Sequence, residues 1–243
     1  MKPYIAIYST FMQRCIDMIQ HDAALQKLPV RFCMDRAGLS PDDGPTHHGL
    51  FDIAMIRSIP NIVFMQPKDE AEFVHMLRTM NHYQNGPTVI RYPRGCGAGT
   101  PVPAKAKILP IGKAEVLQTG RDVTLVSLGT MIGIARETAS LLEARGYTVT
   151  LINARFIKPL DDECIRRHAA RSRVVCTFED HSISGGFNSA VLESLETGDV
   201  KTPVEAIAWP DQFIEHGSES ILRKKYGLTA EAALQKIITH LNS

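Results

Sequence analysis

A regular alternation of short apolar runs with longer amphipathic segments is the feature that most constrains how this chain can fold. Near the N-terminus the strand-like runs and helical patterns alternate in the order 4–8, 11–25, 30–34, 51–58, 62–65, 70–82 and 88–91. Chains of this kind place parallel strands side by side and cover them with the intervening helices. The sequence therefore predicts the α/β fold class, with mainly parallel sheets.

The alternation is interrupted once. Residues 95–112 read GCGAGTPVPAKAKILPIG, rich in Gly, Pro and Ala and without a periodic apolar pattern, which is typical of a linker. We therefore predict two domains, residues 1–95 and 114–243, joined by a linker over residues 96–113. The later strand and helix patterns are at 123–127, 132–145, 148–153, 162–170, 174–178, 187–196 and 204–207, followed by terminal helices.

Charge, hydropathy and cysteine content restrict the partners of the chain. The 27 basic and 26 acidic residues are spread without blocks, which argues against a nucleic acid partner. The apolar runs are far shorter than the ~20 residues of a membrane span, so we expect no membrane partner. The five cysteines form no close pairs, and the first residues, MKPYIAIYSTF, lack the features of a signal or transit peptide. This pattern predicts reduced cysteines and a cytoplasmic location.

The stretch DRAGLSPDDGPTHHG, residues 35–49, is the strongest candidate for a functional loop. It joins a strand pattern to a helix pattern, yet it carries Arg36, Asp43, His47 and His48 within a few positions. Adjacent histidines point in different directions and no third ligand lies at a usual spacing, which argues against zinc. Proton transfer or hydrogen bonding to a substrate fits better. The alternative is a surface loop held by bonds from Asp43 to its own backbone.

Two further groups of candidates follow the first and last strands of the first domain. Tyr8, Phe11 and Arg14 lie where ligands of parallel sheets bind and could hold a ring and an anion; alternatively, they are only the start of a capped helix. Arg94 follows the last strand, and its planar guanidinium, with that of Arg36, suits a phosphorylated or carboxylated small molecule. The alternative is a pair of ordinary exposed arginines.

These segments together resemble a known family. The stretches YSTFMQRCIDMIQHD, DRAGLSPDDGPTHHGLFDIAMIRSIPNIVFMQPKDE and GPTVIRYPRG are similar to 1-deoxy-D-xylulose-5-phosphate synthases of the transketolase superfamily, and the resemblance continues through NARFIKPLD and FEDHSISGGFNSAVLE. It covers essentially the whole chain, but only the C-terminal half of the family protein. It implies a truncated pyrimidine-binding domain followed by the transketolase C-terminal domain. We expect the family's diphosphate- and metal-binding domain, and the glutamate that activates the cofactor, to precede Tyr4.

The resemblance implies a role for most of the candidate residues. Phe11 matches the position whose ring stacks on the aminopyrimidine of thiamine diphosphate, and Arg14 lines the same cofactor site. Asp43 and His47 match the catalytic pair that contacts the substrate and the cofactor-bound intermediate. His48 has no assigned role in the motif. The implied substrate-binding residues are Tyr8, Arg36 and Arg94, of which the arginines bind the phosphate of glyceraldehyde 3-phosphate.

The implied reaction joins pyruvate and glyceraldehyde 3-phosphate into 1-deoxy-D-xylulose 5-phosphate and CO2, a step toward isoprenoid precursors and thiamine. Thiamine diphosphate is the electron sink, so the protein must orient the substrates, exclude water and move protons. A histidine for protons and two arginines for a phosphate agree with the interpretation from the residues alone. The resemblance places the magnesium ligands in the absent N-terminal domain, so we expect no metal ligands in this chain.

The second domain carries weaker signals. Residues 128–133, LGTMIG, follow a strand and open a helix but lack the full G-x-G-x-x-G pattern, and we interpret them as a tight turn. The pairs Asp180-His181 and Gly185-Gly186 are interpreted as architecture or a dimer contact.

Three hypotheses for the whole chain remain open. The first is an enzyme half that works with a partner polypeptide or within a longer parent, for which the family implies a homodimer. The second is a non-catalytic dimerisation or regulatory module, and the third is half of another thiamine diphosphate-dependent transketolase-type enzyme, disfavoured by DGPTHHG and YPRG. We expect the isolated chain to fold but to lack synthase activity, because the superfamily's cofactor site lies between two domains. Copurification with a second polypeptide would favour the first hypothesis over the second.

Overall fold

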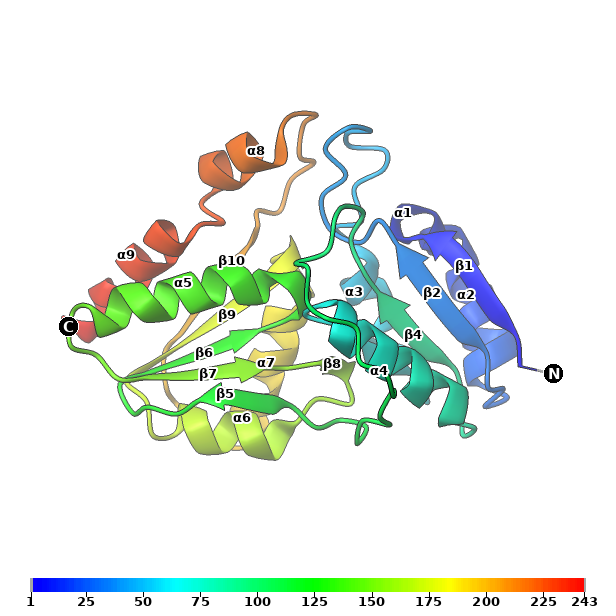
Figure 1. The fold of residues 1–243 in the computed structure, drawn as a ribbon, viewed down its shortest axis with the longest axis horizontal. Coiled ribbons are helices and arrows are strands. Elements are labelled where there is room, and N and C mark those ends of the chain that lie inside the picture. Colours follow the sequence, from blue (N-terminus) through cyan, green and yellow to red (C-terminus); the bar gives the residue numbers. More distant parts are fainter. Residues whose placement is uncertain (1, 243) are drawn as a thin grey trace.

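The alternating pattern folds into two α/β domains in a computed structural model that describes residues 2–242. Figure 1 shows the two sheets side by side, with the N-terminus at the far end of one domain and the C-terminus at the far end of the other. Within residues 2–242 each sheet has five strands, in the orders β1-β2-β4-β3-β8 and β10-β9-β6-β7-β5. Strand β8 pairs antiparallel with β3, and β5 pairs antiparallel with β7. The remaining strand pairs are parallel. The predicted fold class is therefore confirmed.

The first domain is built on the strands that the apolar runs predicted. Its elements are β1 (Tyr4–Tyr8), α1 (Ser9–Met12), α2 (Ile16–Met18), β2 (Arg31–Asp35), α3 (Asp52–Ile56), β3 (Val63–Met65), α4 (Glu70–His82) and β4 (Thr88–Arg91). The continuous helix expected over residues 11–25 is wrong, because a 3-10 turn at Gln13–Cys15 and a π-helical turn at Ile19–Ala24 interrupt it. The π turn inserts an extra residue and still keeps Met12 and Ile19 buried against the sheet.

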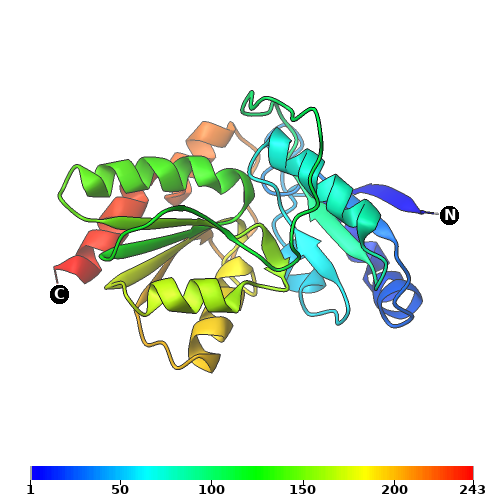
Figure 2. The ribbon, with the colours of Figure 1, turned by 60° about the horizontal axis from the view of Figure 1, so that its bottom comes forward.

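The second domain has helices on both faces of its sheet. Its elements are β5 (Glu115–Gln118), β6 (Val123–Ser127), α5 (Ile132–Glu143), β7 (Val149–Asn153), α6 (Asp162–Ala169), β9 (Val174–Ser182), α7 (Phe187–Thr197), β10 (Val204–Trp209), α8 (Glu219–Tyr226) and α9 (Ala230–Leu241). Helices α5 and α6 lie on opposite faces of this sheet (Figure 2). Strand β8 (Phe156–Lys158) belongs to this half of the sequence but pairs with β3, so it joins the first sheet.

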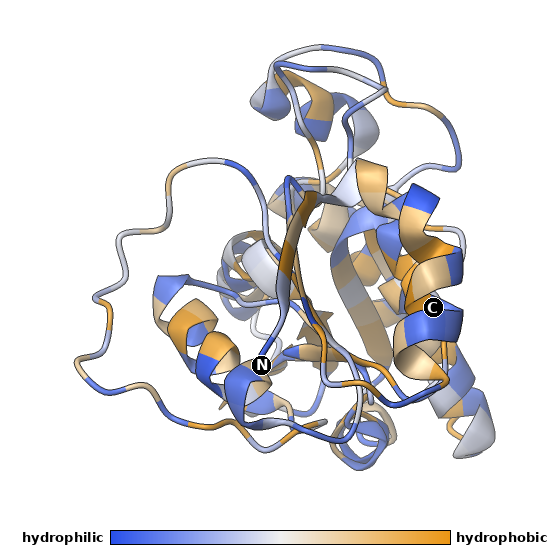
Figure 3. Ribbon diagram, turned by 90° about the vertical axis from the view of Figure 1, so that its right-hand side faces the viewer, coloured by the Kyte–Doolittle hydropathy of each residue, from blue (hydrophilic) through white to orange (hydrophobic). Residues whose placement is uncertain are grey.

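The segment between β4 and β5 runs along the outside of α4, as Figure 3 shows from the side of the first domain. Side chains of α4 fix it there: Glu70 accepts from the amide of Gly99, and Thr79 accepts from the amide of Leu109, both at 2.8 Å. The predicted linker is thus an extended connection bound to the first domain. Its boundaries stay a prediction.

The two domains share apolar cores. One buried cluster joins Phe64 and Met34 of the first sheet to Val126 and Ile152 of the second. A second cluster lies in the second domain but also includes Leu39, from the loop after β2. Because apolar surface of both domains is buried in common clusters, the domains are held in a fixed relation, which places the edge of the first sheet against the second domain.

Candidate active site

The predicted site residues converge at one edge of the first sheet. Strands β1, β2 and β4 run parallel, with Tyr8 opposite Asp35 and Met34 opposite Arg91. The segments that follow these strands therefore leave the sheet at the same carboxyl edge, which is where open parallel sheets commonly bind ligands.

The two predicted arginines meet at one carboxylate oxygen. Arg36 Nη1 donates to Asp43 Oδ2 at 2.6 Å, and Arg94 Nη1 donates to the same oxygen at 3.2 Å. The Arg36 guanidinium also lies over the ring of Tyr8, 4.1 Å from its centroid, and this stacking orients the guanidinium plane. The Asp43 carboxylate thus faces two guanidiniums instead of only closing its own loop. Phosphate binding by these arginines stays a prediction.

An aromatic group extends from this ion cluster. The rings of Tyr8 and Phe11 are stacked, with centroids 5.6 Å apart, and the His47 ring meets the edge of Phe11 at 5.5 Å. The Arg14 guanidinium lies 5.8 Å from the Phe11 centroid. Aromatic rings and a cation beside two arginines are chemically suited to a ligand that has both a ring and a phosphate. The structure therefore brings all the predicted site residues together, and their roles stay predictions.

The two adjacent histidines occupy different environments. His47 is partly exposed next to Phe11, whereas His48 is 3% exposed. The amide of Ser40 donates to His48 Nδ1 at 2.9 Å, so the ring proton is on Nε2, which faces the carbonyl of Glu215 at 3.4 Å. Burial lowers the pKa of His48 and keeps it neutral. His48 is therefore a structural residue, which leaves His47 as the histidine open to a ligand.

The backbone of the loop closes tightly at its base. The amide of Gly38 donates to the carbonyl of Gly49 at 2.9 Å, and the amide of Gly49 returns a bond at 2.7 Å. A Cβ on Gly49 would lie 2.4 Å from Ser9 Oγ, so this position requires glycine. Arg36 has a φ of 53°, which is uncommon for a residue with a side chain and is often found at functional sites.

A buried ionic network lies directly below the loop. Arg91 Nε donates to Asp52 at 2.9 Å and its Nη1 donates to Gln66 at 2.6 Å, while Nη2 donates to the carbonyls of Gly49 and Asp180 at 3.2 and 3.3 Å. The Arg91 and Asp52 side chains are 0% and 1% exposed. The sequence patterns did not predict this network. The sequence signal for the network is the arginine at the end of an otherwise apolar strand, because a buried charge needs a partner.

His181 joins the network from the second domain. Its Nε2 accepts from the amide of Ala54 at 3.3 Å, and its Nδ1 donates to the carbonyl of Ser182 at 2.6 Å. Burial lowers the pKa of His181 to about 4, against the opposing effect of the Asp52 carboxylate. The imidazole is therefore neutral at pH 7, and it acts as a hydrogen-bonding bridge between the domains.

In the second sheet, the carboxyl edge of the parallel strands, where ligands commonly bind, is covered by residues of the first domain. Gly129, in the turn after β6, has a φ of 59°, and a Cβ there would lie 2.2 Å from Gln66 Nε2. Gln66 in turn bonds Arg91. The structure agrees with a tight turn at residues 128–133, and it places Asp180 and His181 in the contact between domains.

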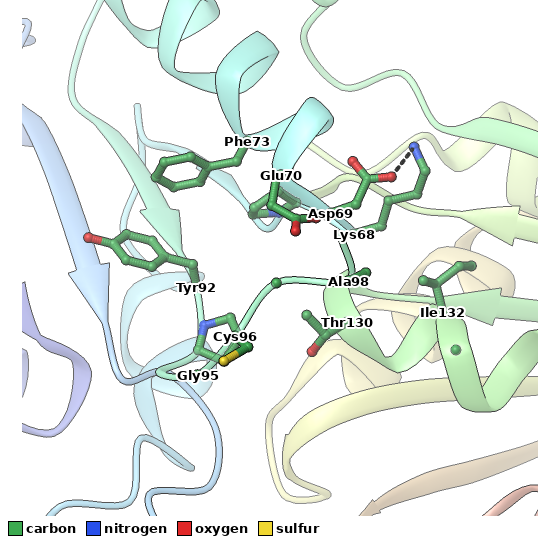
Figure 4. A pocket seen from close by; sticks show the side chains of 14 residues that line it. Lys68, Asp69, Glu70, Phe73, Tyr92, Gly95, Cys96, Ala98, Thr130 and Ile132 are labelled. Atoms are coloured by element: carbon green, nitrogen blue, oxygen red, sulfur yellow. Dashed lines mark ion pairs between the residues drawn. The ribbon is translucent and has the colours of Figure 1, made fainter. Parts of the chain in front are cut away.

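Two cavities lie near this sheet edge. A cavity of about 390 Å³ is lined by Phe11, Arg14 and His47, together with Phe213 of the second domain. Another of about 510 Å³ lies between the start of α4, the loop 95–98 and the start of α5 (Figure 4), and Lys68 there pairs with Asp69 at 3.8 Å. We place the candidate site at the first cavity, because three of the predicted site residues, Phe11, Arg14 and His47, line it and none lines the second.

Within residues 2–242 we find neither a candidate metal-binding cluster nor a candidate membrane-spanning helix. These residues contain no cluster of three or more histidine, cysteine, aspartate or glutamate side chains that could hold a metal ion. None of their helices is both long and apolar enough to cross a bilayer.

Two family models together match most of the chain. The one described as "Transketolase, pyrimidine binding domain" matches residues 1–98, and the one described as "Transketolase, C-terminal domain" matches residues 112–232. A solved structure described as "Split gene transketolase, inactive beta4 tetramer" is 31% identical with a TM-score of 0.86, covering 99% of this chain and 76% of that chain. The chain belongs to the transketolase family. A transketolase from Campylobacter jejuni, at 18% identity and a TM-score of 0.77 over 98% of this chain and 35% of that chain, shares the fold.

Curated relatives of this transketolase-family chain include 1-deoxy-D-xylulose-5-phosphate synthases. The protein from Methylacidiphilum infernorum is 53% identical over 245 residues, covering 100% of this chain and 39% of the relative. The protein from Acidobacterium capsulatum is 52% identical over 241 residues, covering 99% and 38%. The chain therefore corresponds to a C-terminal part of such proteins and spans about two fifths of their length. The resemblance stated from the sequence is confirmed.

Proposed function

We propose that this chain is the part of a thiamine diphosphate-dependent synthase that binds the acceptor substrate and the cofactor's pyrimidine. The reaction joins pyruvate to glyceraldehyde 3-phosphate, with release of CO2, and yields 1-deoxy-D-xylulose 5-phosphate for isoprenoid and thiamine biosynthesis. The identity of about one residue in two with synthases of that name supports this substrate pair. The expected location is the cytoplasm, and the expected complete enzyme is a homodimer of the synthase unit.

One observation carries the proposal. The guanidiniums of Arg36 and Arg94 meet at Asp43 Oδ2, beside the stacked rings of Tyr8 and Phe11. The Arg36 and Asp43 side chains are 20% and 29% exposed, and that of Arg94 is 47% exposed, so water and ligands reach this cluster. Two convergent planar cations next to an aromatic surface form a site for a phosphate attached to a small polar molecule.

The residues present also fit the pyrimidine end of thiamine diphosphate. Phe11 offers a partly exposed ring, and Arg14 and His47 offer polar groups around it. When bound, the cofactor supplies the electron sink for decarboxylation of pyruvate. The resemblance to the synthases is our reason to assign the magnesium ligands to the part of the relatives that lies outside the matched region.

The side chains of this chain then have distinct tasks. Arg36 and Arg94 bind the acceptor phosphate and so fix the distance of its aldehyde from the cofactor. Phosphate displaces the Asp43 carboxylate from the guanidiniums, which frees it to accept a hydrogen bond from a substrate hydroxyl. His47, partly exposed beside Phe11, gives a proton to the oxygen formed from the acceptor carbonyl.

The open edge of the first sheet is the surface that the remaining synthase residues would cover. Strand β1 is the end strand, paired with β2 alone, and its residues Tyr4 and Ile5 are 48% and 43% exposed. Beside it lies an almost wholly apolar groove of about 300 Å³ that includes Met18. An unpaired edge with an apolar groove is suited to accept a further strand and helix. We propose that a polypeptide with the N-terminal part of the relatives occupies it.

The test is product formation from pyruvate and glyceraldehyde 3-phosphate, with thiamine diphosphate and magnesium, with and without a supplied N-terminal half. We expect 1-deoxy-D-xylulose 5-phosphate only from the mixture, because a structurally similar split-gene transketolase is described as an inactive β4 tetramer. Turnover by the chain alone would refute the expected inactivity. No product from the mixture, with both pieces folded and associated, would favour a non-catalytic dimerisation or regulatory module.

A further inference from the structure

The loop that carries the predicted catalytic residues is anchored in the second domain. Leu39 and Leu50, at its two ends, are 5% and 1% exposed and belong to the apolar cluster of the second domain. Trp209, at the end of β10, and Ile214, five residues further along the chain, are buried in the same cluster. The loop therefore leaves the first sheet, enters the core of the other domain and returns.

A carboxylate of the second domain also presses against the base of the loop. A Cβ on Gly38, whose φ is 84°, would lie 2.0 Å from Asp180 Oδ2, so the two are in close contact. Trp209 Nε1 donates to Asp180 Oδ1 at 2.6 Å, and Arg223 Nη2 lies 3.4 Å from Asp180 Oδ2. Because Trp209 and Arg223 each bind one oxygen of the Asp180 carboxylate, this side chain is fixed in position against the turn at Gly38.

The far side of the loop meets the segment that follows β10. His48 Nε2 faces the carbonyl of Glu215 at 3.4 Å, and His216 packs against Gly44, where a Cβ would come within 3.3 Å. The Glu215 carboxylate is bound by Lys225 and Tyr226 of α8. These bonds lower the pKa of Glu215 to about 2, so the carboxylate stays ionised and holds the segment to α8.

Phe213 lies on the same segment and is 80% exposed, although its neighbour Ile214 is 1% exposed. Its ring meets the edge of Phe51 at 5.9 Å, and it lines the 390 Å³ cavity with Phe11 and His47. Covering an exposed apolar ring is favourable, because it removes apolar surface from water. A ligand in the cavity would cover part of that ring.

We propose that the 209–216 segment of the second domain is part of the active site: it positions the loop that carries Asp43 and His47, and Phe213 forms a wall of the cavity that Phe11 and His47 also line. The loop contacts both domains, so its conformation depends on this segment as well as on the first sheet. Glu215 is a positioning residue, because it acts through His48 and through the bonds of its carboxylate to α8. Phe213 contacts the bound substrate and contributes to its selection.

Hydrogen exchange of the chain as it stands tests the positioning role without any activity. We expect Glu215→Ala to speed amide exchange in residues 38–49 roughly fivefold, as for loss of one ordinary hydrogen bond, and Glu215→Gln to have an intermediate effect. The matched control is Glu196→Ala, which removes another exposed carboxylate bonded to a lysine, Lys201. Faster exchange confined to residues 209–218 would overturn the positioning role.

A second measurement tests Phe213 and rests on the proposed function. In the enzyme completed by an N-terminal half, we expect Phe213→Ala to raise the KM for glyceraldehyde 3-phosphate roughly fivefold with little change in kcat. Glu215→Ala should instead lower kcat, because it displaces Asp43 and His47. Phe73→Ala, in the cavity of Figure 4, is the control. Equal KM values for Phe213→Ala and the control would overturn the proposal that Phe213 is a wall of the cavity. Absence of product from the wild-type mixture would refute the proposed function, and the exchange result alone would then decide the positioning role.

Discussion

Replacement of Arg91 by methionine should strongly destabilise the chain. The Arg91 guanidinium is fully buried, and each of its three nitrogens donates a hydrogen bond. Its removal leaves the Asp52 carboxylate, 1% exposed, with the amide of Ile53 as its remaining hydrogen-bond donor, at 2.9 Å. Breaking a buried ion pair from one side typically costs about 3–5 kcal/mol, because a charge is left without its partner. That is a large part of the ~5–15 kcal/mol by which domains are usually stable.

A double-mutant cycle separates the ion pair from the loss of packing. We expect Asp52→Asn to cost about 3 kcal/mol for the same reason, since it leaves the buried guanidinium without a counter-charge. The double variant has no buried charge from either residue, so its cost should fall below the sum of the single costs by roughly 2 kcal/mol. Arg57→Met is the matched control: Arg57 also bridges the domains, but its partner Glu193 is 65% exposed, and we expect a cost of only about 1 kcal/mol.

The assay is equilibrium unfolding in urea at pH 7, followed by circular dichroism and by the fluorescence of Trp209. Circular dichroism reports on both domains, whereas Trp209 lies in the core of the second domain. Since Arg91 bonds both Gly49 and Asp180, the wild-type signals should change together, and those of Arg91→Met should separate. A cost below about 1 kcal/mol for Arg91→Met, or strictly additive costs in the cycle, would refute the reasoning.

The other predictions concern the loop, pH and the arginines. Gly38→Ala should cost about 2–3 kcal/mol in urea unfolding, because φ is 84° and the new methyl would meet Asp180, whereas Gly133→Ala in α5 has open space and should cost nothing. His181 is neutral in the folded chain, with a pKa of about 4, so the free energy of unfolding should fall as the pH drops from about 6.5 to about 4. His181→Asn should reduce this pH dependence, and an unchanged dependence would contradict the assignment. In calorimetric titration, Arg36→Ala should bind inorganic phosphate roughly tenfold more weakly than the wild-type chain, and equal affinity would count against the phosphate site.

The elements that the sequence predicted well have local signals at both ends. Helix α4 lies at the predicted residues 70–82 because Asp69 accepts from the amide of Glu72, and Glu72 accepts in return from the amide of Lys68. Strand β6 follows the polar residues Arg121 and Asp122, is buried along its whole length and is followed by the turn at Gly129. Local chemistry of this kind is readable without any knowledge of tertiary contacts.

The elements that the sequence missed depend on distant partners. Strand β8 is three residues long, and it exists because β3 in the other domain offers a free edge. No residue near Phe156 signals that pairing. The same reason explains why Arg91 and Asp52 escaped notice: each fits an ordinary strand end or helix start, and only the fold brings them to 2.9 Å.

The candidate site was more accessible to prediction, because it follows from topology. Parallel strands deliver their following segments to one edge, so Tyr8, Arg36 and Arg94 had to come near one another once the strands were known. Phe213 could not be found that way. It belongs to the other sheet, and its place beside Phe11 depends on how the two domains pack.

Differences in burial suit the arginines of this sheet edge to the different tasks that we propose for them. The Arg91–Asp52 pair is closed to water, so a ligand that took the place of Asp52 would leave the Asp52 carboxylate buried without a partner. Replacement of Asp52 by a ligand is therefore unfavourable. The pairs of Arg36 and Arg94 with Asp43 are partly exposed, and such pairs contribute only about 0–1 kcal/mol. A phosphate, with more charge than a carboxylate and a geometry that suits two guanidiniums, can therefore displace Asp43 at little cost. The buried pair keeps the edge in shape while the exposed pairs remain free to change partners.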